Sequence, residues 1–309
     1  MDAQSFPFVV ACGRSGTTLL RAMLERHPSM AIPPESYFPV SLYERHGRSR
    51  QVDADSLAAD LLANVRFKDW GLDAATAGTA LAGAADYPAA MRALYAAYAD
   101  ARGKTRYGDK TPPFVLHMDL LARLFPESRF VHVIRDGRDV ARSLVETEFG
   151  PGRITRAAEV WRRRVERGMA SGHTLGPGRY LEIRYESLVA DPAATLTEVC
   201  RFIGLDLVDE MLRPEEAADV AIPERERAHH VNLAKPVTAG LRDWRRDLSA
   251  RDVAAVEAVA GELLSRLGYE RAFPRLPAAA RVRAGVGRAR SEATRRLRRG
   301  ARTMLGERT

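Results

Sequence analysis

Two short stretches of mostly apolar residues have the length and the flanks of buried strands. The first covers residues 6–12 (FPFVVAC), and the second covers residues 129–134 (RFVHVI). Apolar runs of this length are typical of strands that are buried on both faces, as in parallel sheets. Residues 179–185 predict a third strand. We therefore expect the chain to build a buried, mostly parallel sheet.

Segments with the apolar spacing of helices separate and follow these strands. We expect helices over residues 17–27, 55–65, 88–102, 114–125, 136–148, 157–173, 192–203 and 249–267, and a glycine- and proline-marked loop over residues 107–113. Ser249 is placed to cap the last helix. Alternating strands and helices predict an α/β fold of three layers, in which helices flank a central, mostly parallel sheet. Ligand sites in such folds lie at the carboxyl ends of the strands.

The positive charge is concentrated at the C-terminal end of the chain. The 309 residues carry a formal net charge of +8, yet residues 275–309 alone hold eleven arginines and two glutamates. The rest of the chain is close to neutral, which excludes a nucleic-acid-coating surface there. We therefore expect a single α/β domain over residues 1–274 and an arginine-rich tail over residues 275–309.

The tail allows two interpretations. Its apolar residues recur at steps of three or four among the arginines, which is typical of an amphipathic helix that lies on an anionic membrane. Gly285, Gly287 and Gly300 weaken that pattern, and a disordered arginine-rich end is the alternative.

A second loop, residues 214–239, is polar and irregular and is a candidate cover for a bound cofactor.

Cysteine usage and the N-terminus bear on the compartment. Cys12 and Cys200 are the only cysteines, so neither a disulfide framework nor a zinc site is expected. The N-terminus lacks the basic and apolar regions of a signal peptide, and no apolar window approaches the ~20 residues of a membrane span. These features predict a soluble, cytoplasmic protein.

A loop of small residues joins the first predicted strand directly to the first helix. It covers residues 13–18 (GRSGTT). Backbone N–H groups in such a loop and the positive end of the helix dipole favour an anion. The loop differs from that of ATP- and GTP-binding proteins, because Thr17 occupies the place of their lysine and the cation is Arg14.

A second candidate phosphate site follows the second strand. Arg135 stands at the carboxyl end of that strand, and Ser143 comes eight residues later on the next predicted helix. A guanidinium and a hydroxyl can bind a phosphate together. A Mg-dependent P-loop enzyme is expected to have a metal-binding Asp at the place of Arg135. The arginine therefore predicts direct binding of an anion without a metal.

The two fragments together resemble the sulfotransferases that use 3′-phosphoadenosine 5′-phosphosulfate (PAPS). Residues 14–18 look like the 5′-phosphosulfate loop of that family, and Arg135 with Ser143 looks like its 3′-phosphate motif. The resemblance extends over residues 6–270, through DKTPPF, RDGRDVARS and RYESLVADP, and points to the Golgi-type branch, particularly the protein-tyrosine sulfotransferases. It implies a P-loop-like fold, PAPS as cofactor and transfer to a hydroxyl. We expect a soluble, bacterial member.

The resemblance also implies roles for individual residues. Glu35, in the segment PPESYF, matches the general base of the Golgi-type branch, and Lys110 with Arg14 would stabilise the leaving-group oxygen. Contacts with the cofactor are expected from Arg14, Ser15, Gly16, Thr17, Thr18, Arg135, Ser143, Tyr185 and Lys235. His229 and Thr147 replace a serine and an arginine of the protein-tyrosine enzymes, so the outer cofactor contacts are expected to differ. Each assigned residue also has a structural interpretation, such as a solvated lysine or a core tyrosine.

Two other classes of function remain open from the sequence. A P-loop kinase or NTPase is disfavoured by Thr17 and Arg135, which replace the lysine and the aspartate of those enzymes. A noncatalytic adaptor for membranes or nucleic acid is disfavoured by the intact set of candidate catalytic residues. The expected acceptor is a hydroxyl on a sugar, a lipid or another small molecule, and the roles of His229 and His230 are left unassigned.

Overall fold

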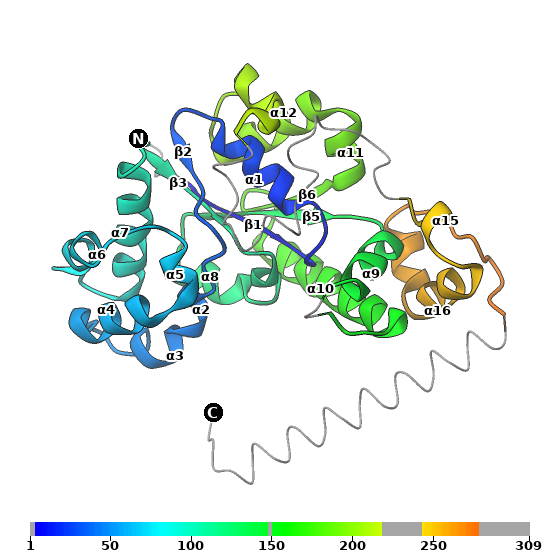
Figure 1. Cartoon of the computed structure of the whole chain (residues 1–309), viewed down its shortest axis with the longest axis horizontal. Coiled ribbons are helices and arrows are strands. Elements are labelled where there is room, and N and C mark those ends of the chain that lie inside the picture. Colours follow the sequence, from blue (N-terminus) through cyan, green and yellow to red (C-terminus); the bar gives the residue numbers. More distant parts are fainter. Residues whose placement is uncertain (1–3, 148–149, 218–242, 278–309) are drawn as a thin grey trace, which may run out of the picture. The chain divides into compact units, whose positions relative to one another are not determined.

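Four parallel strands form the central sheet of the computed structural model, which describes residues 4–147, 150–217 and 243–277. Across the sheet the order is β4 (Asp109–Lys110), β1 (Phe6–Ala11), β5 (Ser128–Ile134) and β6 (Tyr180–Arg184). Figure 1 labels three of these strands, β1, β5 and β6. Each neighbouring pair is parallel. The carboxyl ends of these strands therefore share one edge of the sheet, as the alternation of strands and helices predicts.

The strand β4 lies inside the segment that we expected to be a loop. Asp109 pairs with Phe8 and Lys110 pairs with Val9, both in parallel register. A separate pair, β2 (Met30–Ala31) and β3 (Arg106–Tyr107), precedes it along the chain. The loop prediction was wrong for these residues, because strands of two residues are specified by their partners rather than by a local pattern. The difference places Lys110 on the sheet.

The chain divides into two compact units. Unit 1 is Met1–Arg135 with Arg167–Ala239, and unit 2 is Asp136–Glu166 with Gly240–Thr309. The predictions for Lys235, His229 and His230 lie outside the described residues, as do most of the expected covering loop and of the tail. The expectation of one domain over residues 1–274 with a tail from residue 275 stays a prediction.

Helices cover both faces of the sheet in unit 1. Successive residues of β1 face opposite sides, so Phe8 and Val10 enter one hydrophobic core while Val9 and Ala11 enter the other. The first core is closed by α2 (Phe38–Ser41), α3 (Tyr43–His46), α4 (Ala54–Ala63), α5 (Val65–Lys68), α6 (Ala74–Leu81), α7 (Tyr87–Asp100), η1 (Pro112–Leu116) and α8 (Met118–Leu124). The second is closed by α1 (Thr17–Glu25), α11 (Tyr185–Ala190), α12 (Pro192–Ile203) and η2 (Asp209–Leu212), and η3 (Pro214–Ala217) follows. The predicted three-layer α/β architecture is confirmed.

Aspartate side chains begin several of these helices. Asp53, Asp73 and Asp86 precede α4, α6 and α7, and each accepts a hydrogen bond from the backbone N–H three residues later. Such caps satisfy N–H groups that have no partner within the helix, and each contributes about 1 kcal/mol. The starts of these helices are therefore encoded locally.

Unit 2 is helical in its described part. It contains α9 (Gly137–Val145), the first turns of α10 (Ile154–Leu175), α15 (Trp244–Asp247) and α16 (Ala250–Arg266). The predicted cap of α16 is confirmed, because the Ser249 hydroxyl accepts a hydrogen bond from the Asp252 N–H at 3.1 Å. The buried Arg138 guanidinium bonds to Asp136 at 2.7 Å and to Glu257 at 2.9 Å. This ion-pair cluster ties the start of α9 to α16.

Candidate active site

The loop between β1 and α1 has the geometry of an anion-binding turn. Arg14 and Gly16 both have left-handed backbone angles, with φ values of 72° and 90°. The buried Ser15 hydroxyl donates to the Cys12 carbonyl at 2.6 Å and closes the loop. Gly16 is the N-cap residue of α1 and offers no side chain to the first-turn N–H groups. Backbone strain is thus held at the place where those groups can bind a phosphate or a sulfate.

Tyr185 lies between this loop and Arg135. A Cβ atom placed on Gly16 would come within 2.2 Å of Cδ2 of the Tyr185 ring. The guanidinium carbon of Arg135 lies 4.4 Å from the centroid of the same ring, at the carboxyl end of β5. Three residues predicted to contact the cofactor therefore converge, and only glycine fits at position 16.

A carboxylate and an ammonium meet beside β4. Nζ of Lys110 donates to Oε1 of Glu35 at 2.7 Å, and their side chains are 1% and 17% exposed. Burial raises the pKa of Glu35, but the charge and hydrogen bond of Lys110 and hydrogen bonding with Tyr37 outweigh it. The pKa of Glu35 is consequently held below its ordinary value. The carboxylate is ionised at neutral pH and can accept a proton.

The segment that carries Glu35 turns sharply at Tyr37. That residue has φ 54° and ψ −37°, and the Phe38 N–H donates to the Ser36 carbonyl at 2.6 Å. A γ-turn of this hand is rare and strained. Arg66 lies 4.9 Å from the centroid of the Tyr37 ring and, together with Lys110, helps to keep Glu35 ionised. Neither Tyr37 nor Arg66 was expected from the sequence. No local pattern marks a γ-turn of this kind at Tyr37, and Arg66 comes from a different segment, α5.

Other side chains around Glu35 were missed as well. The Ser36 hydroxyl and the Tyr95 hydroxyl each donate to Oδ2 of Asp109 at 2.7 Å, and the Ser36 N–H donates to the Thr111 hydroxyl at 3.0 Å. Burial raises the pKa of Asp109. The position of Asp109 directly before Lys110 is the one sequence signal that could have identified it.

The other predicted cofactor residues have separate outcomes. Thr17 is buried and Thr18 half-buried in the first turn of α1, next to the phosphate loop. Ser143 lies on α9 in unit 2 and is 3% exposed. Its cooperation with Arg135, which belongs to unit 1, stays a prediction, and Lys235 lies outside the described residues.

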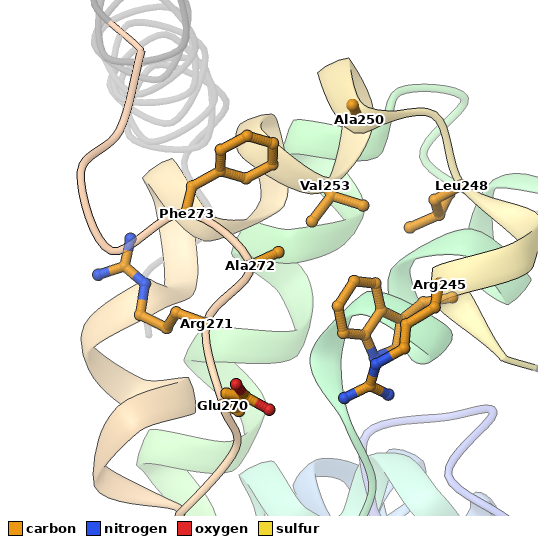
Figure 2. A pocket seen from close by; sticks show the side chains of 9 residues that line it. Arg245, Leu248, Ala250, Val253, Glu270, Arg271, Ala272 and Phe273 are labelled. Atoms are coloured by element: carbon orange, nitrogen blue, oxygen red, sulfur yellow. The ribbon is translucent and has the colours of Figure 1, made fainter.

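Unit 2 has a pocket of its own, with a volume of about 380 Å³. Figure 2 shows Leu248, Val253 and Phe273 around it, and Arg245 and Glu270 add charged groups to its lining. Trp244 completes one wall and packs against the Arg138 guanidinium at 3.7 Å. None of the predicted site residues in the described ranges lines this pocket.

The described residues show neither a metal-binding cluster nor a membrane-spanning helix. Residues 4–147, 150–217 and 243–277 contain no group of three or more His, Cys, Asp or Glu side chains arranged to hold a metal ion. Within the same ranges, no helix combines the length and the apolar character that crossing a bilayer requires. The expected absence of a metal from the reaction stays a prediction.

The fold and the site define an α/β protein with an anion-binding loop and a carboxylate–ammonium pair at the carboxyl edge of a parallel sheet. Residues 8–210 match the model of the sulfotransferase family. The chain belongs to this family, and the protein is a sulfotransferase. The enzyme class predicted from the sequence motifs is confirmed.

Individual relatives agree with this assignment. The chain is 28% identical over 276 residues to protein-tyrosine sulfotransferase 2 of Gallus gallus, an alignment that covers 85% of this chain and 69% of the relative. It is 26% identical over 290 residues to the nodulation protein NoeE of Sinorhizobium fredii, covering 86% and 66%. The predicted resemblance to the protein-tyrosine sulfotransferases is confirmed.

A solved structure shares the fold. The sulfotransferase domain of the Synechococcus PCC 7002 olefin synthase superposes with a TM-score of 0.60 at 24% identity, covering 87% of this chain and 98% of that domain. The domain from the curacin biosynthetic pathway gives a TM-score of 0.54 at 23% identity, covering 87% and 99%. These similarities show the P-loop-like sulfotransferase fold.

Proposed function

We propose that Glu35 is the general base of this sulfotransferase and removes the proton of an acceptor hydroxyl during in-line transfer, without a metal ion. The 2.7 Å contact between Glu35 and Lys110 carries the proposal, because it places a proton acceptor beside a cation at the carboxyl edge of the sheet. Positioned acid–base groups of this kind contribute about 10²- to 10⁴-fold to a rate. The sulfuryl donor is PAPS, which supplies the sulfuryl group when bound.

The residues around the phosphate loop fit a phosphate-bearing donor. The uncapped start of α1 offers N–H groups, and Arg14 and Arg135 offer guanidinium groups within unit 1. We assign the 5′ end of the donor to Arg14, Ser15, Gly16, Thr17 and Thr18, and the 3′ end to Arg135, Ser143, Tyr185 and Lys235. Tyr185 supports both groups, since its ring contacts the loop and Arg135.

Lys110 can serve two partners in turn. In the structure its ammonium holds the Glu35 carboxylate. Negative charge that develops on a leaving oxygen would compete for the same ammonium, and an ammonium already fixed in place needs no reorganisation to stabilise it. As Lys110 turns from Glu35, burial acts on the carboxylate with less opposition, and Glu35 becomes a stronger base. Arg14 would assist at the same oxygen.

For the acceptor we propose a hydroxyl on a sugar, a lipid or another small molecule. The curated relatives include protein-tyrosine sulfotransferases and a nodulation protein, so resemblance to the first does not by itself make tyrosine the acceptor. For the tail, residues 275–309, we propose reversible contact of a cytoplasmic enzyme with anionic membranes, on the strength of its arginine content. Co-sedimentation with anionic liposomes should be weaker for residues 1–274 than for the full chain; equal binding would contradict the contact.

The test of the function begins with the nucleotide. Adenosine 3′,5′-bisphosphate (PAP), the product of PAPS, should raise the melting temperature of the protein, because ligands of the native state stabilise it. ATP with Mg²⁺ should give a smaller shift. Radiolabelled PAPS added to extracts of the source cells should then label a product whose identification gives the acceptor. Stabilisation by ATP with Mg²⁺ but not by PAP would favour a nucleotide kinase or NTPase instead.

A further inference from the structure

Asp109 connects the two chain segments that carry the proposed base and the proposed cation. It directly precedes Lys110 on β4, and its Oδ2 atom accepts the hydroxyl of Ser36, which directly follows Glu35. The Tyr95 hydroxyl, from α7, donates to the same oxygen at 2.7 Å. All three side chains are fully buried. The hydrogen-bonded group Ser36–Asp109–Tyr95 is called the Asp109 cluster below.

Residues 32–38, which include Glu35, are called the base segment below. Other side chains also hold its backbone but do not reach β4. Arg21 donates to the Ile32 carbonyl at 2.8 Å, Trp70 donates to the Pro34 carbonyl at 3.0 Å, and Tyr87 donates to the Phe38 carbonyl at 3.1 Å. Those donors fix the segment to the surrounding helices. Apart from the Glu35–Lys110 contact itself, Ser36 is the residue of this set that joins the segment to β4, through Asp109, and to Thr111 directly after that strand.

Burying the carboxyl group of Asp109 in this cluster costs more free energy than a purely structural role requires. A carboxyl group removed from water loses its hydration, and only some of that loss is recovered by hydrogen bonds. Oδ1 of Asp109 is buried, and it has no hydrogen-bond partner among the residues that the structure describes. An apolar residue would fill a core position at lower cost. A buried acceptor for two hydroxyls is useful where it sets the position of a neighbouring group.

We propose that Asp109, with Ser36 and Tyr95, is a positioning residue that holds the Glu35 carboxylate and the Lys110 ammonium in register for proton removal from the acceptor. The inference rests on the proposed role of Glu35 as base. The cluster acts through backbone geometry: it fixes residue 36 next to the base and residue 109 next to the cation. Displacement of a reacting group by about 1 Å can cost on the order of 10²-fold in rate.

Single substitutions that remove one hydroxyl test the proposal. Tyr95→Phe and Ser36→Ala should each lower kcat by about 10- to 100-fold, while the dissociation constant of PAP changes less than about twofold. Asp109→Asn keeps an oxygen that can accept both hydroxyls and should retain more activity than either. Tyr180→Phe is the matched control, because it removes a tyrosine hydroxyl that donates to the Glu182 carboxylate at 2.7 Å. That variant should keep the wild-type kcat.

Measuring the effect of Tyr95→Phe in a Glu35→Gln variant distinguishes a positioning role from general stabilisation of the fold. In Glu35→Gln, Tyr95→Phe should cause no further loss of single-turnover transfer, because the group that it positions is already disabled. The melting temperature and the number of PAP-binding sites of each variant show how much protein is folded. An equal loss in both backgrounds, measured per PAP-binding site, would overturn the positioning role.

Failure of the proposed function would give different experimental results from failure of the positioning role alone. If the wild-type protein binds no PAP or Glu35→Gln transfers sulfate at the wild-type rate, the role of Glu35 fails and the inference fails with it. If wild type is active, Glu35→Gln is impaired and Tyr95→Phe keeps the wild-type kcat, only the positioning role fails. A kcat loss confined to the wild-type background supports it.

Discussion

Nζ of Lys110 lies 2.7 Å from Oε1 of Glu35, although 75 residues separate the two along the chain. The contact exists because the short strand β4 adds to β1 in parallel and carries Lys110 to the carboxyl edge of the sheet. A buried ion pair of this kind contributes little net stability, but loss of either partner leaves an uncompensated charge. A change in either residue is therefore expected to affect both the stability of the fold and the proposed proton transfer.

Removal of Lys110 should destabilise the protein in a pH-dependent way. In wild type the folded-state pKa of Glu35 is lowered, so its contribution to stability is present above about pH 4.5 and is lost as the pH falls through the folded-state pKa. In Lys110→Met, burial is expected to raise that pKa instead. The free energy of unfolding should fall by about 3 kcal/mol at pH 7 and by much less near pH 4. Urea denaturation at both values measures the difference.

Lys68→Met is the control for that experiment, because Lys68 is exposed on α5. It should change the free energy of unfolding by less than about 0.5 kcal/mol at either pH. A loss for Lys110→Met that is the same size at pH 7 and at pH 4 would mean that the ion pair does not set the pKa of Glu35.

Gly16→Ala should damage the phosphate loop. The new Cβ would meet Tyr185 at 2.2 Å, and alanine would also have to adopt φ 90°. We expect a loss of about 3 kcal/mol in the free energy of unfolding, from backbone strain and overpacking together, and weaker binding of PAP. Gly71→Ala is the matched control: Gly71 has φ 67° with nothing within 4 Å of the added Cβ, so only the strain of about 1 kcal/mol should appear. Equal losses in the two variants would show that contact with Tyr185 is unimportant.

Part of the fold could be predicted from local pattern, and part could not. The strand at residues 6–12 and the cap at Ser249 are encoded by neighbouring residues, and both occur in the structure. β4 was missed because Gly108 and Pro112 mark a loop, while its two residues become a strand only by pairing with Phe8 and Val9. Long-range pairing of this kind leaves no periodic signal in the sequence.

The candidate site shows the same division. The phosphate loop could be predicted because its strand, glycines and helix are contiguous. Glu35 and Lys110 were each expected by resemblance, but their contact depends on β4 and could not be anticipated. The Asp109 cluster joins α7, β4 and the base segment, so no stretch of sequence contains it. Tyr185 was expected near the cofactor, whereas its packing against Gly16 required the fold.

Arg135→Lys should weaken nucleotide binding although the charge is kept. The guanidinium carbon lies 4.4 Å from the centroid of the Tyr185 ring, and the planar group can bind a phosphate through a fixed fork of two N–H groups. An ammonium has neither the planar shape nor the fixed fork. We expect the dissociation constant of PAP, measured by calorimetry, to rise at least about tenfold, on the scale of a lost charge-assisted hydrogen bond. Arg129→Lys, at the other end of β5, should leave it unchanged, because Arg129 donates to the Phe202 carbonyl. Unchanged affinity for Arg135→Lys would remove Arg135 from the donor site.

The most direct measurement of the central claim compares wild type with Glu35→Gln in transfer of radiolabelled sulfate from PAPS to the identified acceptor. Glu127→Gln is the control, since Glu127 also forms an ion pair, with Arg92 at 2.6 Å, although that pair is less buried. We predict that Glu35→Gln binds PAP as wild type does and transfers at least about 100-fold more slowly, while Glu127→Gln keeps the wild-type rate. Transfer by Glu35→Gln at the wild-type rate would contradict the assignment of Glu35 as the base.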